Sequence, residues 1–204
     1  MNPDADRPLA TDHEMETSRC RLRYPRLDDV PRLQSAFTSP SFPQDVPLAE
    51  LTTVEQVTQW IQGCQARWAR GQGYTWTVEE KAGGTIVGQV SLTRLPSSVE
   101  WALAFWTHPD GWGQGYAPEA AHRVLRFAFE GLEASRIWAA AGTWNQSSQR
   151  VLRKLGMAVI GDNPAGYMMR GRAIATVEFE ITQEAWQQST PLPGRAAGRR
   201  SPKR

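Results

Sequence analysis

Residues 112–120, with the sequence WGQGYAPEA, place two glycines directly before the amphipathic stretch AHRVLRFAFEGL. The apolar spacing of that stretch predicts a helix that ends near residue 132. The start of a helix leaves four backbone N–H groups without intrahelical partners, and the helix dipole adds partial positive charge there. Because glycine lets other groups approach the backbone closely, Gly113 and Gly115 suit an anion such as phosphate. A tight packing turn without a ligand has the same spacing, so both interpretations stay open.

The turn does not match two familiar nucleotide-binding patterns. Its glycines do not form GxGxxG with an acidic residue about 20 positions further on, and the chain contains no GxxxxGK[ST]. The sequence therefore does not indicate a dinucleotide-binding fold or a Walker-type site.

Hydrophobic patterning predicts a single α/β domain. Alternation predicts strands at 18–25, 74–80, 85–95 and 99–109, which we expect to form an antiparallel sheet, with helices at 27–37 and 52–73. Thr52 and Glu55 predict a capping box for the second helix. After the helix that follows the glycine turn, strands are predicted at 135–141, 157–161 and 172–182, with a helix at 145–156 and a glycine-rich loop between the last two strands. We expect a mixed, mostly antiparallel sheet of about seven strands flanked by helices.

Charges of opposite sign collect at the two ends of the chain. The 204 residues carry a net charge of +2, of which residues 1–17 contribute −4 and residues 189–204 contribute +5. We predict a disordered acidic leader at 1–17, a folded domain at 18–187 and a disordered basic tail at 188–204. Because the body is nearly neutral, we expect no specific nucleic-acid partner.

Composition also bounds the location and the redox chemistry. No apolar run approaches the roughly 20 residues of a membrane span, and the first residues lack a basic region followed by an apolar one. We therefore expect a cytoplasmic protein without a membrane partner. Cys20 and Cys64 have neither the number nor the spacing of a disulfide framework or a zinc site, so free thiols and no bound metal are predicted.

Two central segments resemble a known family. WTHPDGWGQGYAPEA at 106–120 and RIWAAAGTWNQSSQRVLRKLGM at 136–157 are similar to the acyl-CoA-binding core of the GNAT superfamily of N-acetyltransferases, and to its RimJ/RimL-like branch, which acetylates protein N-termini and related amines. The resemblance runs from about residue 18 to residue 186. It implies an opening between the fourth and fifth strands. It also implies transfer of an acetyl group from acetyl-CoA to an amine in one ternary complex, with no metal and no covalent enzyme intermediate.

The resemblance assigns a binding role to the glycine turn and to the strand before it. The amides of the turn would hold the pyrophosphate of coenzyme A, while the strand would pair through its backbone with the pantetheine arm and donate an N–H to the thioester oxygen. Asn145 would bond the pantetheine amide. The implied cofactor-binding residues are Phe105, Trp106, Thr107, Gly113, Gln114, Gly115, Tyr116, Ala117 and Asn145.

Ser148 is the implied catalytic acid, because its hydroxyl matches the serine of the family's Asn-x-x-Ser and can protonate the departing thiolate. Without the family, Asn145 is simply a helix N-cap and Ser148 a residue of the first turn. The tyrosine that other branches use as the acid, seven residues beyond the asparagine, is replaced here by Leu152.

The sequence does not identify a general base by pattern. Relatives often have an acid at the position of Ala102 and another near 138–140, and these positions are apolar here. Glu100, two residues earlier on the same strand face as Ala102, is the catalytic candidate, with a solvated charge at the strand end as the alternative. A route without a base, in which the site selects a neutral amine, also satisfies the chemistry.

The missing acids support a second hypothesis, a non-catalytic acyl-CoA-binding or partner-docking module. A third hypothesis, a nucleic-acid binder driven by the tail at 189–204, predicts that binding depends steeply on salt concentration.

The expected acceptor is a protein N-terminus or a small amine, and a homodimer is left open. Some of the nine tryptophans could line an acceptor pocket instead of filling the core, and Trp144, in a loop beside Asn145, is the first to test.

Overall fold

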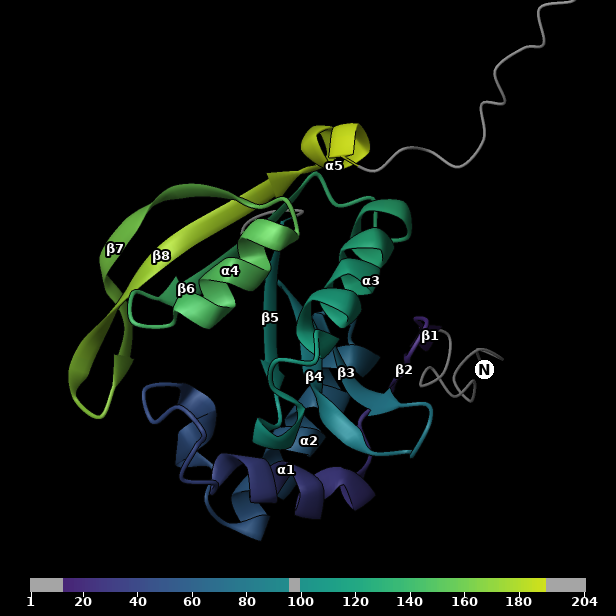
Figure 1. The fold of residues 1–204 in the computed structure, drawn as a ribbon, viewed down its shortest axis with the longest axis vertical. Coiled ribbons are helices and arrows are strands. Elements are labelled where there is room, and N and C mark those ends of the chain that lie inside the picture. Colours follow the sequence, from purple (N-terminus) through teal and green to yellow (C-terminus); the bar gives the residue numbers. More distant parts are fainter. Residues whose placement is uncertain (1–12, 96–99, 190–204) are drawn as a thin grey trace, which may run out of the picture.

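The computed structural model describes residues 13–95 and 100–189. Within these residues the strands form one sheet in the order β1-β2-β3-β4-β5-β6-β8-β7. Figure 1 shows this twisted sheet with α1 and α2 together at one end and with α3 and α4 in front of the strands, α3 against β4 and β5 and α4 against β6. The strands are β1 (Met15–Glu16), β2 (Cys20–Arg23), β3 (Gly73–Glu80), β4 (Ile86–Arg94), β5 (Trp101–Thr107), β6 (Arg136–Gly142), β7 (Ala158–Met169) and β8 (Arg172–Thr182). The helices are α1 (Val30–Phe37), α2 (Val54–Ala69), α3 (Tyr116–Glu130), α4 (Gln146–Lys154) and α5 (Gln183–Ser189).

The predicted fold class is confirmed. β1 to β5 pair with their sequence neighbours in antiparallel fashion, and β5 and β6 form the parallel pair. The sheet has eight strands where about seven were predicted, because the two-residue strand β1 lies within the segment assigned to the leader. Residues 1–12 of that leader, and the tail from residue 190 onward, fall outside the described residues.

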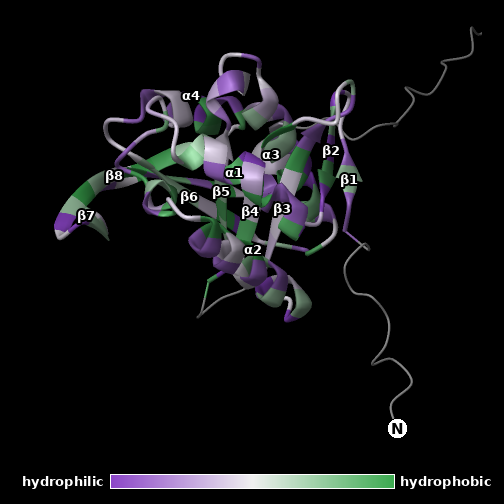
Figure 2. Ribbon diagram, turned by 90° about the horizontal axis from the view of Figure 1, so that it is seen from below, coloured by the Kyte–Doolittle hydropathy of each residue, from purple (hydrophilic) through white to green (hydrophobic). Residues whose placement is uncertain are grey.

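Two hydrophobic cores hold the helices to the sheet. The first packs the buried side of α3, including Val124 and Leu125, against β-strand residues such as Trp76 and Leu103. The second joins α1 and α2 to the chain between them and to the far end of the β7–β8 hairpin. Figure 2 shows hydrophobic residues recurring along the central strands β3 to β5. Both cysteines are buried and unpaired, as predicted.

Two local predictions are wrong. The capping box of α2 consists of Thr53 and Gln56, one residue later than predicted, because the Gln56 side chain reaches back to the backbone N–H of Thr53 while the Thr53 side chain accepts from the Gln56 N–H. The glycine-rich loop predicted after residue 161 is instead the second half of β7, which pairs with β8. Breaks in its register next to Gly161 and between Asn163 and Tyr167 let the strand continue through the glycines.

β5 and β6 separate after a short contact. They pair only at Trp101–Ile137 and Ala102–Trp138, although β5 runs on to Thr107 and β6 to Gly142. Beyond Ala102, β5 remains paired with β4 on its other side. The predicted opening between the fourth and fifth long strands therefore lies between β5 and β6.

No helix among the described residues is long and apolar enough to cross a membrane.

Candidate active site

The glycine turn forms the start of α3. Gly113 and Gly115 have φ angles of 76° and 80°, in the left-handed region that glycine adopts without strain, and Gly115 is the N-cap of the helix. These angles reverse the chain after β5 and aim the first amides of α3 outward from the helix end. The sequence folds this way because no side chain larger than hydrogen is present at either position.

The amides of this turn have no acceptor within the described part of the chain. None of the backbone N–H groups from Gly113 to Ala117 donates a hydrogen bond, and the next residue, Pro118, has no N–H. Gly113, Gln114 and Gly115 are exposed. Successive outward N–H groups at the positive end of a helix form a ready anion site. The residues present thus fit a phosphate group.

Arg19, directly before β2, contacts the glycine turn. The Arg19 guanidinium donates to the Gln114 carbonyl oxygen at 2.9 Å and lies 4.8 Å from the Tyr116 ring centre. Arg19 also donates to the carboxylate of Glu119, in the first turn of α3, with a closest N–O distance of 2.6 Å. The sequence gives no sign of this contact, because Arg19 and Glu119 are 100 residues apart and neither belongs to a recognisable motif.

The carboxylate of Glu119 is held strongly in its charged form. Partial burial raises its pKa, but hydrogen bonds from Thr17, from the backbone and side chain of Arg19 and from Ser18 outweigh that effect and lower the pKa to about 2. The charged carboxylate therefore keeps Arg19 and the start of α3 together through the neutral pH range.

We expect this pair to make stability depend on acid pH. Because the folded pKa lies below the ordinary value of 4.5, the contribution is complete above about pH 5 and falls as the pH approaches 2. Between pH 5 and pH 3 the wild type should lose about 1–2 kcal/mol more unfolding free energy than Glu119→Gln, less than the full shift implies because the pair is partly exposed. Urea unfolding at both pH values measures this. The control is Glu130→Gln, which removes an exposed pair with Arg126 on the same helix; equal losses in wild type and Glu119→Gln would contradict the expectation.

The backbone of β5 presents free groups to the opening. The backbone N–H of His108 donates to the Val87 carbonyl, and the N–H of Leu95 donates to the Glu100 carbonyl. These two bonds determine which residues of β5 are hydrogen-bonded to β4. In an antiparallel pair these groups alternate, so even-numbered residues of β5 bond to β4 and odd-numbered residues point away from it. The backbone N–H and C=O of Phe105 and the N–H of Thr107 therefore face the opening, beyond the point where β6 stops pairing, whereas the Thr107 carbonyl accepts from Trp112 Nε1 at 2.8 Å.

Trp106 does not fit the backbone role predicted for it. Its carbonyl oxygen points toward β4, where a Cβ at Gly88 would come within 2.1 Å of it. Its side chain projects to the opposite side from α3, stacks edge-on with Phe37 at 4.8 Å and donates to Gln89 Oε1 at 3.2 Å. Backbone pairing with a ligand thus remains a prediction for Phe105 and Thr107 only.

Asn145 and Ser148 lie at the start of α4, across the opening from β5. Asn145 is the N-cap, and its Oδ1 accepts from the Ser148 N–H at 3.0 Å. Ser148 Oγ has no hydrogen-bond partner among the described residues, whereas Ser147 Oγ accepts from Arg150 at 3.0 Å. Of the two serines, Ser148 is the one with a hydroxyl available for a ligand.

Comparison with known proteins identifies the family. The family model described as an acetyltransferase (GNAT) domain matches residues 19–158, more than half of the chain. The chain belongs to the GNAT acetyltransferase family.

Individual relatives agree with this assignment. The uncharacterized N-acetyltransferase YoaA of Bacillus subtilis is 27% identical over 143 residues, which cover 70% of this chain and 81% of YoaA. Solved structures share the fold. RimL, the ribosomal L7/L12 alpha-N-protein acetyltransferase solved with coenzyme A, has a TM-score of 0.75 at 17% identity and covers 84% of this chain and 99% of its own. RimJ of Mycobacterium smegmatis, solved with CoA-disulfide, has a TM-score of 0.73 at 17% identity and covers 87% and 88%.

Within this GNAT domain, Glu100 is engaged by an arginine. Its Oε1 lies 2.7 Å from Arg136, which also pairs with Glu180 at 3.1 Å. A carboxylate held by a guanidinium is a weaker proton acceptor than an unpaired one. The catalytic role of Glu100 stays a prediction, and the geometry does not favour it.

Two exposed tryptophans lie at the turns that precede α3 and α4. Trp112 is 46% exposed and donates to the Thr107 carbonyl at 2.8 Å. Trp144 is 42% exposed, and its indole covers Gly142, where a Cβ would come within 2.5 Å of the ring nitrogen. Trp144, the first tryptophan to test as part of an acceptor pocket, therefore lies at the surface beside Asn145. By contrast, Trp68, Trp76, Trp101 and Trp186 are buried in the core.

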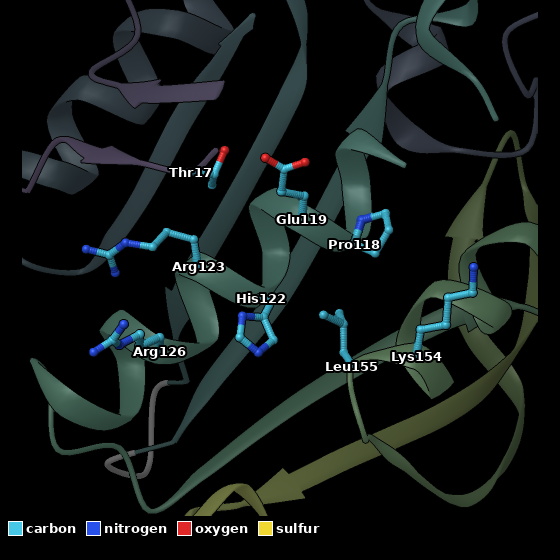
Figure 3. Close-up of a pocket in the computed structure, with 8 residues that line it drawn as sticks. All are labelled: Thr17, Pro118, Glu119, His122, Arg123, Arg126, Lys154 and Leu155. Carbon is cyan, nitrogen blue, oxygen red and sulfur yellow. The ribbon is translucent and has the colours of Figure 1, made fainter. Parts of the chain in front are cut away.

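A pocket of about 460 Å³ lies along the outer side of α3 next to the end of α4. Figure 3 shows its side chains, which come from α3, from Thr17 and from the C-terminal end of α4. The lining residues are Thr17, Pro118, Glu119, His122, Arg123, Arg126, Lys154 and Leu155. None of the residues predicted for catalysis or cofactor binding is among them, so this pocket lies outside the candidate site.

Proposed function

We propose that this GNAT protein is an acetyl-CoA-dependent N-acetyltransferase that moves an acetyl group to a primary amine by direct attack in a ternary complex. The observation that carries the proposal is the run of acceptor-free amides from Gly113 to Ala117, which begins with three exposed residues and lies next to a strand whose backbone is open toward β6. Such amides suit the pyrophosphate of coenzyme A, and an open strand suits the pantetheine arm.

The reaction needs a donor for the thioester oxygen and an acid for the thiolate. The N–H of Phe105 faces the opening, and a preorganised amide of this kind stabilises the oxyanion of the tetrahedral intermediate, a contribution of several kcal/mol in other acyl transfers. Ser148 Oγ supplies the proton to the departing sulfur, and Asn145 contacts the arm of the cofactor. Binding and orientation supply much of the remaining rate.

The acceptor in this proposal is a protein N-terminus or a small amine. RimL, which shares the fold, is described as acting on a ribosomal protein N-terminus. The alternative, a non-catalytic acyl-CoA-binding or partner-docking module, is favoured by Ala102, which stands where relatives often have an acid. We expect the enzyme in the cytosol.

Thiol release separates these possibilities. Purified protein is mixed with acetyl-CoA and, in turn, a peptide with a free N-terminus, spermidine and lysine at pH 7 to 9, and free CoA is measured. We expect release with at least one amine. Binding of CoA without release from any amine, under conditions in which a verified homologue is active, would support the binding module and contradict the enzyme.

A further inference from the structure

One face of the sheet beside the opening is lined by small side chains. The residues that pack toward α3 alternate with those on the other face, so Ala102, Ala104 and Trp106 of β5 share that other face. The strand register shows which residues of β6 and β8 lie on the same face. Ala102 pairs with Trp138 of β6, and Ala140 of β6 pairs with Glu178 of β8. Ala104 and Ala140 are both exposed, which leaves room between β5 and β8 on this face.

The two ends of this face are occupied. At one end Trp106 packs with Phe37 and Phe42 in the second core. At the other end Arg136 binds Glu100 and Glu180. The exposed alanines lie between these ends, on the side of the sheet opposite to α3 and the glycine turn.

Glu178 is the carboxylate that borders the alanines without an arginine partner among the described residues. It is half-buried, and one carboxylate oxygen accepts from the Asn163 side-chain amide at 2.8 Å. Asn163 is fixed in turn, because its Oδ1 accepts from the backbone N–H groups of Ala165 and Gly166. The irregular register of β7 at Asn163 thus orients the side chain that holds Glu178.

The other charged groups on this face already have partners. Arg136 pairs with both Glu100 and Glu180, and Arg172 pairs with Asp45 at the far end of the hairpin. Among the described residues, an ammonium group that enters between these pairs meets one carboxylate that is held by a hydrogen bond and is not paired with a cation. That carboxylate is Glu178.

Resting on the proposed acetyl transfer, we propose that Glu178 is the proton acceptor for the attacking amine and that the acceptor substrate binds as a cationic primary ammonium. The ammonium donates one proton to the Glu178 carboxylate and becomes the neutral nucleophile. Its lone pair forms the C–N bond to the thioester carbon, and the C–S bond then breaks. The second nitrogen proton leaves as the thiolate is protonated through Ser148, and Glu178 returns its proton to water.

Asn163 has a positioning role in this scheme. Its amide keeps one oxygen of Glu178 aimed along the sheet and leaves the second oxygen to meet the substrate. Ala102 and Ala140 bring only methyl groups to this face, which leaves space for the substrate nitrogen.

The test is the pH profile of kcat/KM for Glu178→Gln, with acetyl-CoA and a peptide whose free N-terminus has a pKa near 8. Without its proton acceptor the variant uses only the neutral amine, which is about 3% of the peptide at pH 6.5 and nearly all of it at pH 9.5. We expect kcat/KM to fall about 30-fold at pH 6.5 and less than about 3-fold at pH 9.5, with an unchanged Kd for CoA. Glu180→Gln, which removes an equal charge two residues along the same strand face, is the matched control and should keep the wild-type profile.

The outcomes separate this inference from the proposed function. If the wild type turns over the peptide and Glu178→Gln loses the same factor at every pH, or nothing, then Glu178 is not the proton acceptor while the acetyl transfer stands. Restoration of the low-pH rate by Glu178→Asp would support a carboxylate role. If the wild type acetylates no amine, the proposed function fails and this inference fails with it.

Discussion

Gly115→Glu should abolish the binding of coenzyme A. Gly115 has a φ of 80°, and a Cβ there would lie 3.5 Å from Arg19 Nη2. A glutamate side chain at this point sits among the amides that we assign to the pyrophosphate, where its charge competes for the same donors and repels the phosphates. We expect the Kd for CoA to rise at least about 100-fold, equivalent to about 2.7 kcal/mol. Isothermal titration calorimetry measures it.

The chain offers a matched control for this variant. Gly84, in the turn between β3 and β4, also has a positive φ, of 66°, and no atom lies within 4 Å of the position of a Cβ there. Gly84→Glu therefore adds the same charge and similar backbone strain away from the site. Equal CoA affinity for the two variants would mean that the turn of α3 does not bind the cofactor.

Ser148→Ala should slow the chemical step and leave cofactor binding nearly intact. The hydroxyl has no partner among the described residues, so its removal leaves no buried group unpaired. Proton transfer by a positioned group typically contributes about 100-fold or more, and we expect kcat to fall by about that factor. Steady-state release of CoA gives kcat, and calorimetry gives the affinity.

Ser147→Ala is the control for that variant, since Ser147 is the adjacent residue and its hydroxyl is engaged by Arg150. We expect it to keep wild-type turnover within about 3-fold, in line with loss of an exposed hydrogen bond. Unaltered turnover in Ser148→Ala would remove Ser148 from the mechanism.

Local sequence signals predicted the parts of the site that depend on neighbouring residues. The glycine turn and the unpaired amides at the start of α3 follow from WGQGYAPEA, because helix starts are set within a few residues. Asn145 as the N-cap of α4 follows in the same way. The central strands followed from their alternation, and the antiparallel pairing of β3 to β5 from the short turns between them.

Features that depend on register or on distant contacts could not be predicted. The backbone direction of Trp106 depends on the phase of the β4–β5 ladder, which alternates with every residue and is not visible in side-chain patterning. The contact of Arg19 with Gln114 and the place of Glu178 opposite Ala140 arise only when the sheet is assembled. β7 was predicted as a short strand and a loop because its residues are largely exposed and lack alternation.

A crystal structure of the protein with coenzyme A tests the central claim most directly. The account predicts pyrophosphate oxygens within hydrogen-bond distance of backbone N–H groups between Gly113 and Ala117, with the pantetheine arm between β5 and β6. Coenzyme A bound elsewhere, or a turn that stays free of phosphate at saturating ligand, would contradict it.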